Sequence, residues 1–247
     1  MPMDFERLTE MSYVDLKTVA EKMGIKPPRN KTDLVREIRK GFKEYEEYKH
    51  RKIDPYTWGE QIGNKGKEGI TYAVTDREGH KLAVKTFKKT KSSEALRREA
   101  RLQKLAADVG AAPNVVATDV INKRIYMQRL DRHLVDVIQE QGGHLSETHQ
   151  RRIVTILRKI DDAGVFHADS NITNWMLSTR GKIYLIDYGM AKDINPALIK
   201  KVGTSTPNLD YGTATLVIQL RKVGAPDSSY SLLRRHIPED QQRKLGL

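Results

Sequence analysis

Apolar positions in the first 43 residues of the chain follow the spacing of short helices. Apolar residues three and four apart line one face of a helix, and glycine or proline interrupts such a pattern. Two groups of this kind are present: Leu16, Val19, Ala20 and Met23 before Gly24, and Leu34, Val35, Ile38 and Phe42 after Pro27-Pro28. We therefore predict two short helices joined by a tight turn, then a charged helix or linker over 44–49 and a domain boundary at Asp54-Pro55.

The pattern changes to that of strands after Trp58. Apolar and β-branched runs at 61–63, 70–74 and 81–87 predict three strands, with a turn at Asp76–Gly79. Residues 93–107 then return to helical spacing, with Ser93 as the candidate N-cap. A further strand is predicted over 125–130. The order of these elements is that of an antiparallel meander followed by a helix.

A hairpin is predicted near the other end of the chain. Residues 175–177 and 182–186 are apolar runs, and Ser178-Thr179-Arg180-Gly181 between them is typical of a turn. The remainder after residue 130 is mainly helical in pattern, and no internal repeat or low-complexity tract is present.

Composition narrows the class of protein. The chain has 247 residues, 38% of them hydrophobic, which is enough for one or two domains with real cores. It has no cysteine, so disulfides are excluded, and no apolar run approaches the roughly 20 residues that cross a bilayer. With no signal-peptide pattern at the N-terminus, we expect a soluble intracellular protein, cytoplasmic or nuclear, with no membrane partner. The net charge of +12 favours an anionic partner, without choosing between nucleic acid, nucleotide and acidic protein.

Three polar residues around the predicted hairpin carry the candidate chemistry. Asp169 lies in His167-Ala168-Asp169-Ser170-Asn171-Ile172-Thr173-Asn174, and Asp187-Tyr188-Gly189 follows thirteen positions after Asn174. Phosphoryl transfer needs one carboxylate near the attacking hydroxyl and oxygen ligands that hold Mg²⁺ on the phosphates. The spacing of Asp169, Asn174 and Asp187 resembles the catalytic core of the protein kinase superfamily.

The resemblance implies ATP and Mg²⁺ as cofactors and a role for each residue. Asp169 would orient the acceptor hydroxyl and take its proton, and Asn174 and Asp187 would hold the metal. Ala83-Val84-Lys85 matches the family's A-x-K, so Lys85 would bind the phosphates and pair with a glutamate on the next helix. Glu99 is the better candidate for that partner and Glu94 the alternative. His167 is expected to pack or hydrogen-bond within the catalytic loop.

The nucleotide contacts follow from the same resemblance. Gly63, Gly66 and Gly69, with Ile62 before them, would form the glycine-rich loop, although the first two glycines are three apart where the family has two. Met127 would lie at the back of the adenine pocket. Gln128 and Arg129 would begin the hinge whose backbone recognises adenine.

Other positions indicate the branch of the superfamily. Ala168 replaces the family's usual Arg, so regulation by a phosphorylated activation loop is not expected, and Asn171 stands where Ser/Thr kinases commonly have Lys. Asp187-Tyr188-Gly189-Met190-Ala191 resembles the D-Y-G-L-A of casein-kinase-like and vaccinia-related kinases, which act on Ser/Thr. Only 58 residues follow Gly189, so the C-lobe is expected to be abbreviated, as in compact atypical kinases.

The helical segment at the N-terminus resembles a second family. Leu16-Lys17, Ala20, Gly24-Ile25, Lys31, Leu34 and Ile38 are similar to the SAP domain, a small DNA-binding module, and a helical hairpin docked on the catalytic domain is the alternative. The expected fold is α+β and bilobal, with a SAP-like domain at 1–48, a kinase N-lobe at 49–130 and a C-lobe at 131–247. The combination also resembles an enzyme of a large DNA virus.

Three functions stay open at this point. The leading hypothesis is a Ser/Thr protein kinase that acts on an unidentified protein substrate, and residues 1–48 would target it to DNA. A small-molecule phosphotransferase shares H-x-D-x-x-x-x-N. A DNA-binding scaffold with an inactive kinase fold is the third.

Overall fold

The computed structural model describes residues 7–50, 56–62 and 68–247, without the side chains of residues 7 and 44–50. The contacts divide the chain into two compact units. The first runs up to Arg98 and includes Val116–Met127, and the second comprises Glu99–Val115 and Gln128–Leu247. The three-domain division expected from the sequence stays a prediction.

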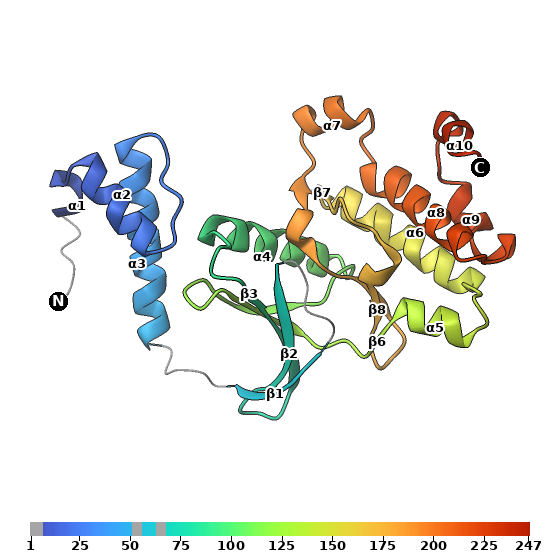
Figure 1. The fold of residues 1–247 in the computed structure, drawn as a ribbon, viewed down its shortest axis with the longest axis horizontal. Coiled ribbons are helices and arrows are strands. Elements are labelled where there is room, and N and C mark those ends of the chain that lie inside the picture. The colour runs from blue at the N-terminus through green and yellow to red at the C-terminus, as the bar shows by residue number, and fades with distance from the viewer. Residues whose placement is uncertain (1–6, 51–55, 63–67) are drawn as a thin grey trace. The chain divides into compact units, whose positions relative to one another are not determined.

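Three helices open the first unit: α1 (Arg7–Glu10), α2 (Tyr13–Lys22) and α3 (Lys31–His50), with α2 packed on α3 (Figure 1). Side-chain oxygens cap the two longer ones, because Ser12 Oγ accepts from the Asp15 N–H at 3.2 Å and Asn30 Oδ1 from the Asp33 N–H at 2.8 Å. Their apolar faces form a small core: Leu8, Leu16, Ala20, Ile25, Leu34, Val35 and Ile38. The two predicted helices are confirmed.

A five-stranded sheet forms the rest of this unit, in the order β1-β2-β3-β5-β4. Its strands are β1 (Thr57–Gln61), β2 (Gly69–Thr75), β3 (Lys81–Phe87), β4 (Val115–Asp119) and β5 (Arg124–Gln128). The first three pair antiparallel, and β2 and β3 are joined by the predicted turn, where the Gly79 N–H donates to the Asp76 carbonyl at 3.1 Å. Strand β4 was missed from the sequence. One face of the sheet buries Val74, Leu82, Val84 and Tyr126.

The helix predicted after the meander is α4 (Ser93–Asp108). The prediction that Ser93 caps it is wrong, because the Ala95 N–H donates to Ser92 Oγ at 3.1 Å. Ser93 is the first helical residue, and its buried hydroxyl accepts from Lys123 Nζ at 2.8 Å. The boundary between the two units falls within α4, after Arg98.

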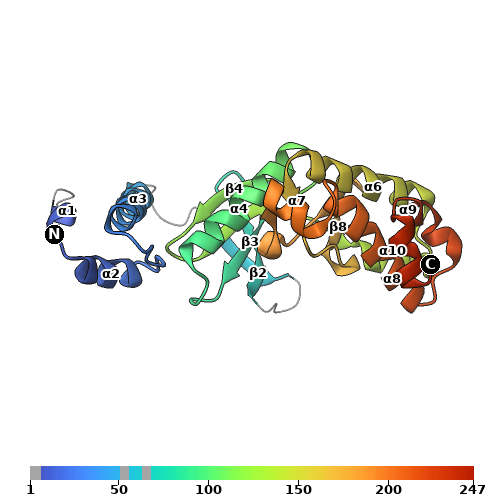
Figure 2. The same ribbon diagram turned by 90° about the horizontal axis from the view of Figure 1, so that it is seen from above.

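The second unit is mainly helical. Its helices are α5 (Leu134–Glu140), α6 (Glu147–Asp162), α7 (Pro196–Val202), α8 (Thr213–Lys222), α9 (Ser231–Arg234) and α10 (Glu239–Leu245). Helix α9 packs against both α6 and α8, as both views show (Figures 1 and 2). A π-helical turn at Asn208–Gly212 leads into α8 and also contacts α6. Their apolar faces bury one continuous core that includes Leu157, Trp175 and Leu216.

Short antiparallel strands carry the loops of this unit. Strand β8 (Trp175–Leu177) pairs with β9 (Ile183–Leu185) and with β6 (Arg132–His133), and β7 (Val165–Phe166) pairs with β10 (Lys192–Asp193). The turn between β8 and β9 closes with the Gly181 N–H on the Ser178 carbonyl at 2.8 Å, and Gly181 has a φ of 69°. The predicted hairpin is confirmed. The described chain is α+β, and no helix within it is long and apolar enough to span a membrane.

Candidate active site

His167 is the buried centre of the candidate catalytic loop, residues 167–174. It follows β7, is fully buried, and packs edge-on against the ring of Tyr188 at 4.6 Å between centroids. Its Nε2 lies 3.0 Å from the Ile186 carbonyl oxygen, and its Nδ1 lies 3.3 Å from the Asp169 N–H nitrogen. Because a carbonyl can only accept and an N–H can only donate, the neutral Nε2–H tautomer satisfies both contacts. Burial lowers the pKa of His167 to about 4, so the predicted packing role is confirmed.

Asp169 lies partly buried at the surface of the same loop. The Asn171 side-chain NH₂ donates to Asp169 Oδ1, and Asn174 Nδ2 donates to the Asp169 backbone carbonyl at 3.0 Å. A short 3₁₀ turn over Ile172–Asn174 places both amides on Asp169. The carboxylate is therefore held as an acceptor, the state in which it can take a proton from a hydroxyl.

The backbone of Asn174 is joined across the hairpin to the residue that precedes Asp187. The Ile186 N–H donates to the Asn174 carbonyl at 2.8 Å, one residue beyond the pairing of Trp175 with Leu185. The nitrogen of the Asn174 amide is taken by Asp169, which leaves its oxygen Oδ1 as the ligand atom. That oxygen and the Asp187 carboxylate are hard oxygen donors, the ligands that Mg²⁺ prefers. The donor set fits the predicted metal, whose charge would neutralise the phosphate oxygens in the transition state.

Two non-glycine residues of the candidate site have left-handed backbones: Ala168 before the hairpin, with a φ of 64°, and Asp187 after it, with a φ of 66°. This conformation costs an L-residue roughly 1–2 kcal/mol, and such strain concentrates at functional sites. At Asp187 it is partly offset, because Oδ1 accepts from the Gly189 N–H at 3.4 Å.

A pair of buried polar residues supports the loop from beneath. Asn208 Oδ1 accepts from the His167 N–H at 2.8 Å, and Asn208 Nδ2 donates to the Val165 carbonyl at 2.6 Å and to Asp161 Oδ1 at 2.7 Å. The Asp161 carboxylate also accepts from the N–H groups of Asn208 and Leu209. Burial raises the pKa of Asp161 to about 6, against these hydrogen bonds. Sequence reasoning missed both residues, since neither belongs to a local motif.

The first unit carries Lys85 on β3. Ala83, Lys85 and Phe87 share the face of the strand opposite to the one that buries Leu82 and Val84, and Lys85 Nζ lies 4.9 Å from the Phe87 ring centroid. Gly69 pairs with Phe87 on the neighbouring strand, where a Cβ would lie 2.2 Å from the Thr86 carbonyl oxygen. Gly69 is therefore needed for the close approach of two strands, and its predicted phosphate contact stays a prediction.

The other residues predicted to contact the nucleotide belong to both units. Glu99 is buried in α4, on the second unit, while Lys85 is on the first, so their pairing stays a prediction. The alternative partner, Glu94, is exposed. Met127 and Gln128 end β5, and the Gln128 N–H donates to the Asn114 carbonyl at 2.9 Å, so that N–H is already used in the sheet. Ile62 and Arg129 are partly buried, and Gly63 and Gly66 lie outside the described residues.

Helix α4 is also joined to the segment after Asp187. Arg101 on α4 forms an ion pair of 2.7 Å with Asp193 on β10, which raises the pKa of Arg101. Both side chains are about half exposed, so the pair contributes little to stability.

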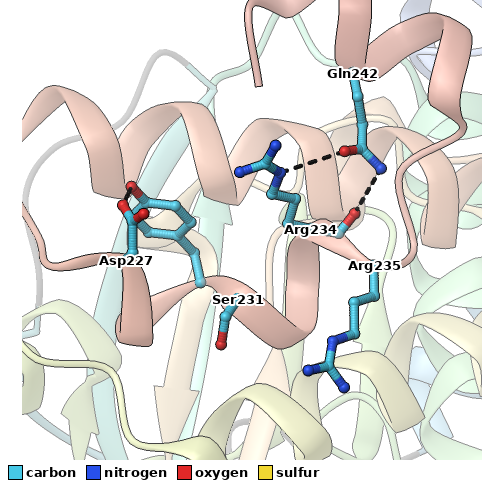
Figure 3. A pocket seen from close by; sticks show the side chains of 6 residues that line it. Asp227, Ser231, Arg234, Arg235 and Gln242 are labelled. Atoms are coloured by element: carbon cyan, nitrogen blue, oxygen red, sulfur yellow. Dashed lines mark hydrogen bonds between the residues drawn. The ribbon is translucent and has the colours of Figure 1, made fainter.

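A cavity of about 240 Å³ lies elsewhere in the second unit (Figure 3). Asp227, Tyr230, Ser231, Arg234, Arg235 and Gln242 line it. Gln242 fixes Arg234, since its Oε1 accepts from Arg234 Nε at 3.3 Å and its Nε2 donates to the Arg234 carbonyl at 3.2 Å. None of the predicted catalytic residues contributes to this cavity.

The α+β fold, the catalytic loop and the D-Y-G hairpin define a protein-kinase-like chain. The model of the ABC1 atypical kinase-like domain matches residues 78–207, more than half of the chain, and the chain belongs to this family. It is also similar to a probable serine/threonine-protein kinase of Corynebacterium efficiens, with 25% identity over 193 residues. That match covers 72% of this chain and 29% of the relative, so the chain spans less than a third of the relative's length.

The predicted membership of the protein kinase superfamily is thereby confirmed. The family match contains Lys85, Glu99, Asp169, Asn174 and Asp187. Three finer expectations stay predictions: the closer likeness to casein-kinase-like and vaccinia-related kinases, the SAP-like identity of the N-terminal helices, and the viral origin.

Proposed function

We propose that the chain transfers the γ-phosphate of ATP, with Mg²⁺, to serine or threonine hydroxyls of a protein substrate. The observation that carries the proposal is the hydrogen bonding around Asp169: the Asn171 NH₂ donates to its carboxylate, Asn174 Nδ2 donates to its backbone carbonyl, and the Ile186 N–H, next to Asp187, donates to the Asn174 carbonyl. A kinase-like family and a relative described as a probable serine/threonine kinase agree with it. Regulation by loop phosphorylation is not part of the proposal, because Ala168 offers no charge to a phosphorylated loop.

In the proposed reaction Asp169 orients the acceptor hydroxyl and takes its proton as the oxygen attacks the γ-phosphorus. Asn174 and Asp187 hold the metal, and Lys85 binds the phosphates. His167 stays neutral and supports the loop, because its pKa of about 4 keeps it uncharged at physiological pH. Glu99 would orient Lys85.

The test is transfer of radiolabelled γ-phosphate to the chain itself and to a basic protein, followed by phosphoamino-acid analysis. Asp169→Asn keeps the shape of the side chain but cannot accept the proton, and should lower the rate by about 10²-fold or more. Asp162→Asn, at an exposed position of α6, is the matched control and should leave the rate unchanged. Equal rates for Asp169→Asn and the unmodified chain would refute the role of Asp169.

The same assay separates the alternatives. Transfer only to small hydroxyl compounds would indicate a small-molecule phosphotransferase. Binding of ATP without transfer to any acceptor would indicate a scaffold with an inactive kinase fold.

We further propose that the N-terminal helices bind DNA, as their resemblance to the SAP domain implies. The supporting observation is a row of exposed basic residues on α3, Arg36, Arg39 and Lys40, opposite the buried Leu34 and Ile38; Arg36 also forms an ion pair of 2.7 Å with Asp33, which DNA phosphates would have to displace. Phosphate contacts by such residues give affinity that falls steeply with salt.

The test is duplex DNA binding by the full chain at several salt concentrations. Changing Arg36, Arg39 and Lys40 to Ala should reduce the slope of log affinity against log salt by about 0.9 for each lost phosphate contact. The matched control changes three exposed lysines of the second unit, Lys192, Lys200 and Lys201. An equal reduction by the control would show that general charge, and not α3, binds the DNA.

A further inference from the structure

Gln219 on α8 lies at the end of a chain of hydrogen bonds that leads to Asp169. Gln219 Oε1 accepts from the Ile172 backbone N–H at 2.7 Å, and Gln219 Nε2 donates to Asn171 Oδ1. Asn171 Nδ2 then donates to Asp169 Oδ1. Gln219 is 48 positions from Asn171 in the chain, and all of these residues are partly buried.

The Ile172 N–H fixes which groups donate and which accept in this series of hydrogen bonds. A side-chain amide can turn over and exchange its oxygen and nitrogen, but the Ile172 N–H can only donate. The Ile172 N–H therefore donates to the oxygen of Gln219, which directs the Gln219 NH₂ toward Asn171. Asn171 then accepts through its oxygen, and this directs its own NH₂ toward the Asp169 carboxylate.

We infer that Gln219 is a positioning residue for phosphate transfer: through Asn171 it holds the Asp169 carboxylate in the orientation that receives the acceptor hydroxyl. The inference rests on the proposed function for its catalytic readout. Asn171 occupies the place where Ser/Thr kinases commonly have Lys, and a lysine ammonium donates in every direction without help. A neutral amide donates on one side only, so here a second residue must set its direction.

Two variants of Gln219 separate positioning from structural support. Gln219→Glu keeps the length of the side chain and an oxygen for the Ile172 N–H, but puts a second carboxylate oxygen against Asn171. Whichever way the Asn171 amide turns, one of the two carboxylates then faces its oxygen. Gln219→Met loses the bond to the Ile172 N–H, yet leaves Asn171 able to donate to Asp169.

The variant with the higher melting temperature should therefore have the lower kcat. Gln219→Glu should melt near the unmodified chain but lose about 10²-fold in kcat, with the KM for ATP within about threefold, since small displacements of a reacting group cost that much. Gln219→Met should melt lower but lose only about tenfold in kcat. A purely structural role predicts the same order in both measurements, and that result would overturn the inference.

A second measurement does not depend on activity. Hydrogen exchange of side-chain amides, followed by NMR in the full chain, should be slower for Asn171 and Gln219 than for the exposed amide of Gln141. Exchange as fast as that of Gln141 would overturn the hydrogen-bonded chain itself. If these amides exchange slowly but the protein transfers no phosphate, the hydrogen bonds from Gln219 to Asp169 would be supported and the proposed function would be refuted instead.

Discussion

Replacement of Asn208 tests how the loop that carries His167 and Asp169 is supported. Replacing it with Ala removes three side-chain hydrogen bonds, to the His167 N–H, the Val165 carbonyl and the Asp161 carboxylate. Asp161 keeps two backbone donors, from residues 208 and 209. The buried N–H and carbonyl lose their partners, however, and each such loss costs about 1–3 kcal/mol. We expect Asn208→Ala to lower the free energy of unfolding of the second unit by about 3–5 kcal/mol, a large part of a typical total.

The chain offers a convenient probe for this measurement. It has two tryptophans, and Trp175 is fully buried in the core of the second unit while Trp58 lies in the first. In a Trp58→Phe background, the fluorescence of Trp175 during urea unfolding reports on the second unit alone. Asn195→Ala is the matched control, because Asn195 makes one exposed capping bond, at 2.9 Å to the Leu198 N–H, and should cost about 1 kcal/mol. If Asn208→Ala cost no more than this control, the reasoning would be refuted.

Three further predictions concern other buried groups. The hydroxyl of Tyr188 is buried with no hydrogen-bond partner among the described residues, so Tyr188→Phe should leave stability unchanged or raise it by about 1 kcal/mol, and a clear loss in urea unfolding would contradict this. The pKa of His167 is lowered from 6.5 to about 4, so the folded state loses stability as the pH falls through that window, by up to about 3 kcal/mol. The pKa of Asp161 is raised to about 6, so protonation of Asp161 stabilises the folded state as the pH falls below 6. The difference in unfolding free energy between the unmodified chain and His167→Gln therefore isolates the contribution of the histidine. If that difference were the same at pH 7 and pH 4, the lowered pKa of His167 would be contradicted. Gly69→Ala should destabilise the sheet by roughly 3 kcal/mol or more, because its Cβ would lie 2.2 Å from the Thr86 carbonyl oxygen, and unchanged hydrogen exchange in β2 and β3 would show that the strands can separate to accept it.

Local patterns predicted much of the fold. Helical spacing located α2, α3 and α4, and apolar runs around Ser178–Gly181 located the β8–β9 hairpin, because these elements are specified by neighbours in sequence. Strand β4 has no clear alternation and was missed. The cap of α4 was misplaced by one residue, since Ser92 and Ser93 are equally good caps by type and only their backbone positions distinguish them.

In the candidate site, too, residues within a local motif were predicted from the sequence and residues distant in sequence were not. Asp169, Asn174 and Asp187 lie within one short stretch of sequence, and their spacing alone indicated them as candidates; their catalytic and metal-binding roles stay predictions. Asn208 and Gln219 carry no motif and lie 41 and 48 positions from the residues to which they bond, His167 and Asn171, so their roles depend on how α6, α8 and the π-helical turn pack. Nothing in the sequence indicates which amide points toward which backbone group.

The hydrogen bonds of Asn171, Asn208 and Gln219 also bear on how the protein ages. Hydrolysis of a side-chain amide, which consumes water and releases ammonia, leaves the shape of the side chain almost unchanged and replaces its NH₂ donor with a carboxylate oxygen. Asn171 and Asn208 each donate to an aspartate, and Gln219 donates to an amide oxygen, so the new charge would face an acceptor at all three positions. Thermolabile amides are a known weak point of proteins. Here hydrolysis of the amide of Asn171 or Gln219 would disturb the hydrogen bonds that orient Asp169 while most of the core stayed intact, so a preparation could pass tests of folding and still contain molecules with a misdirected Asp169 carboxylate.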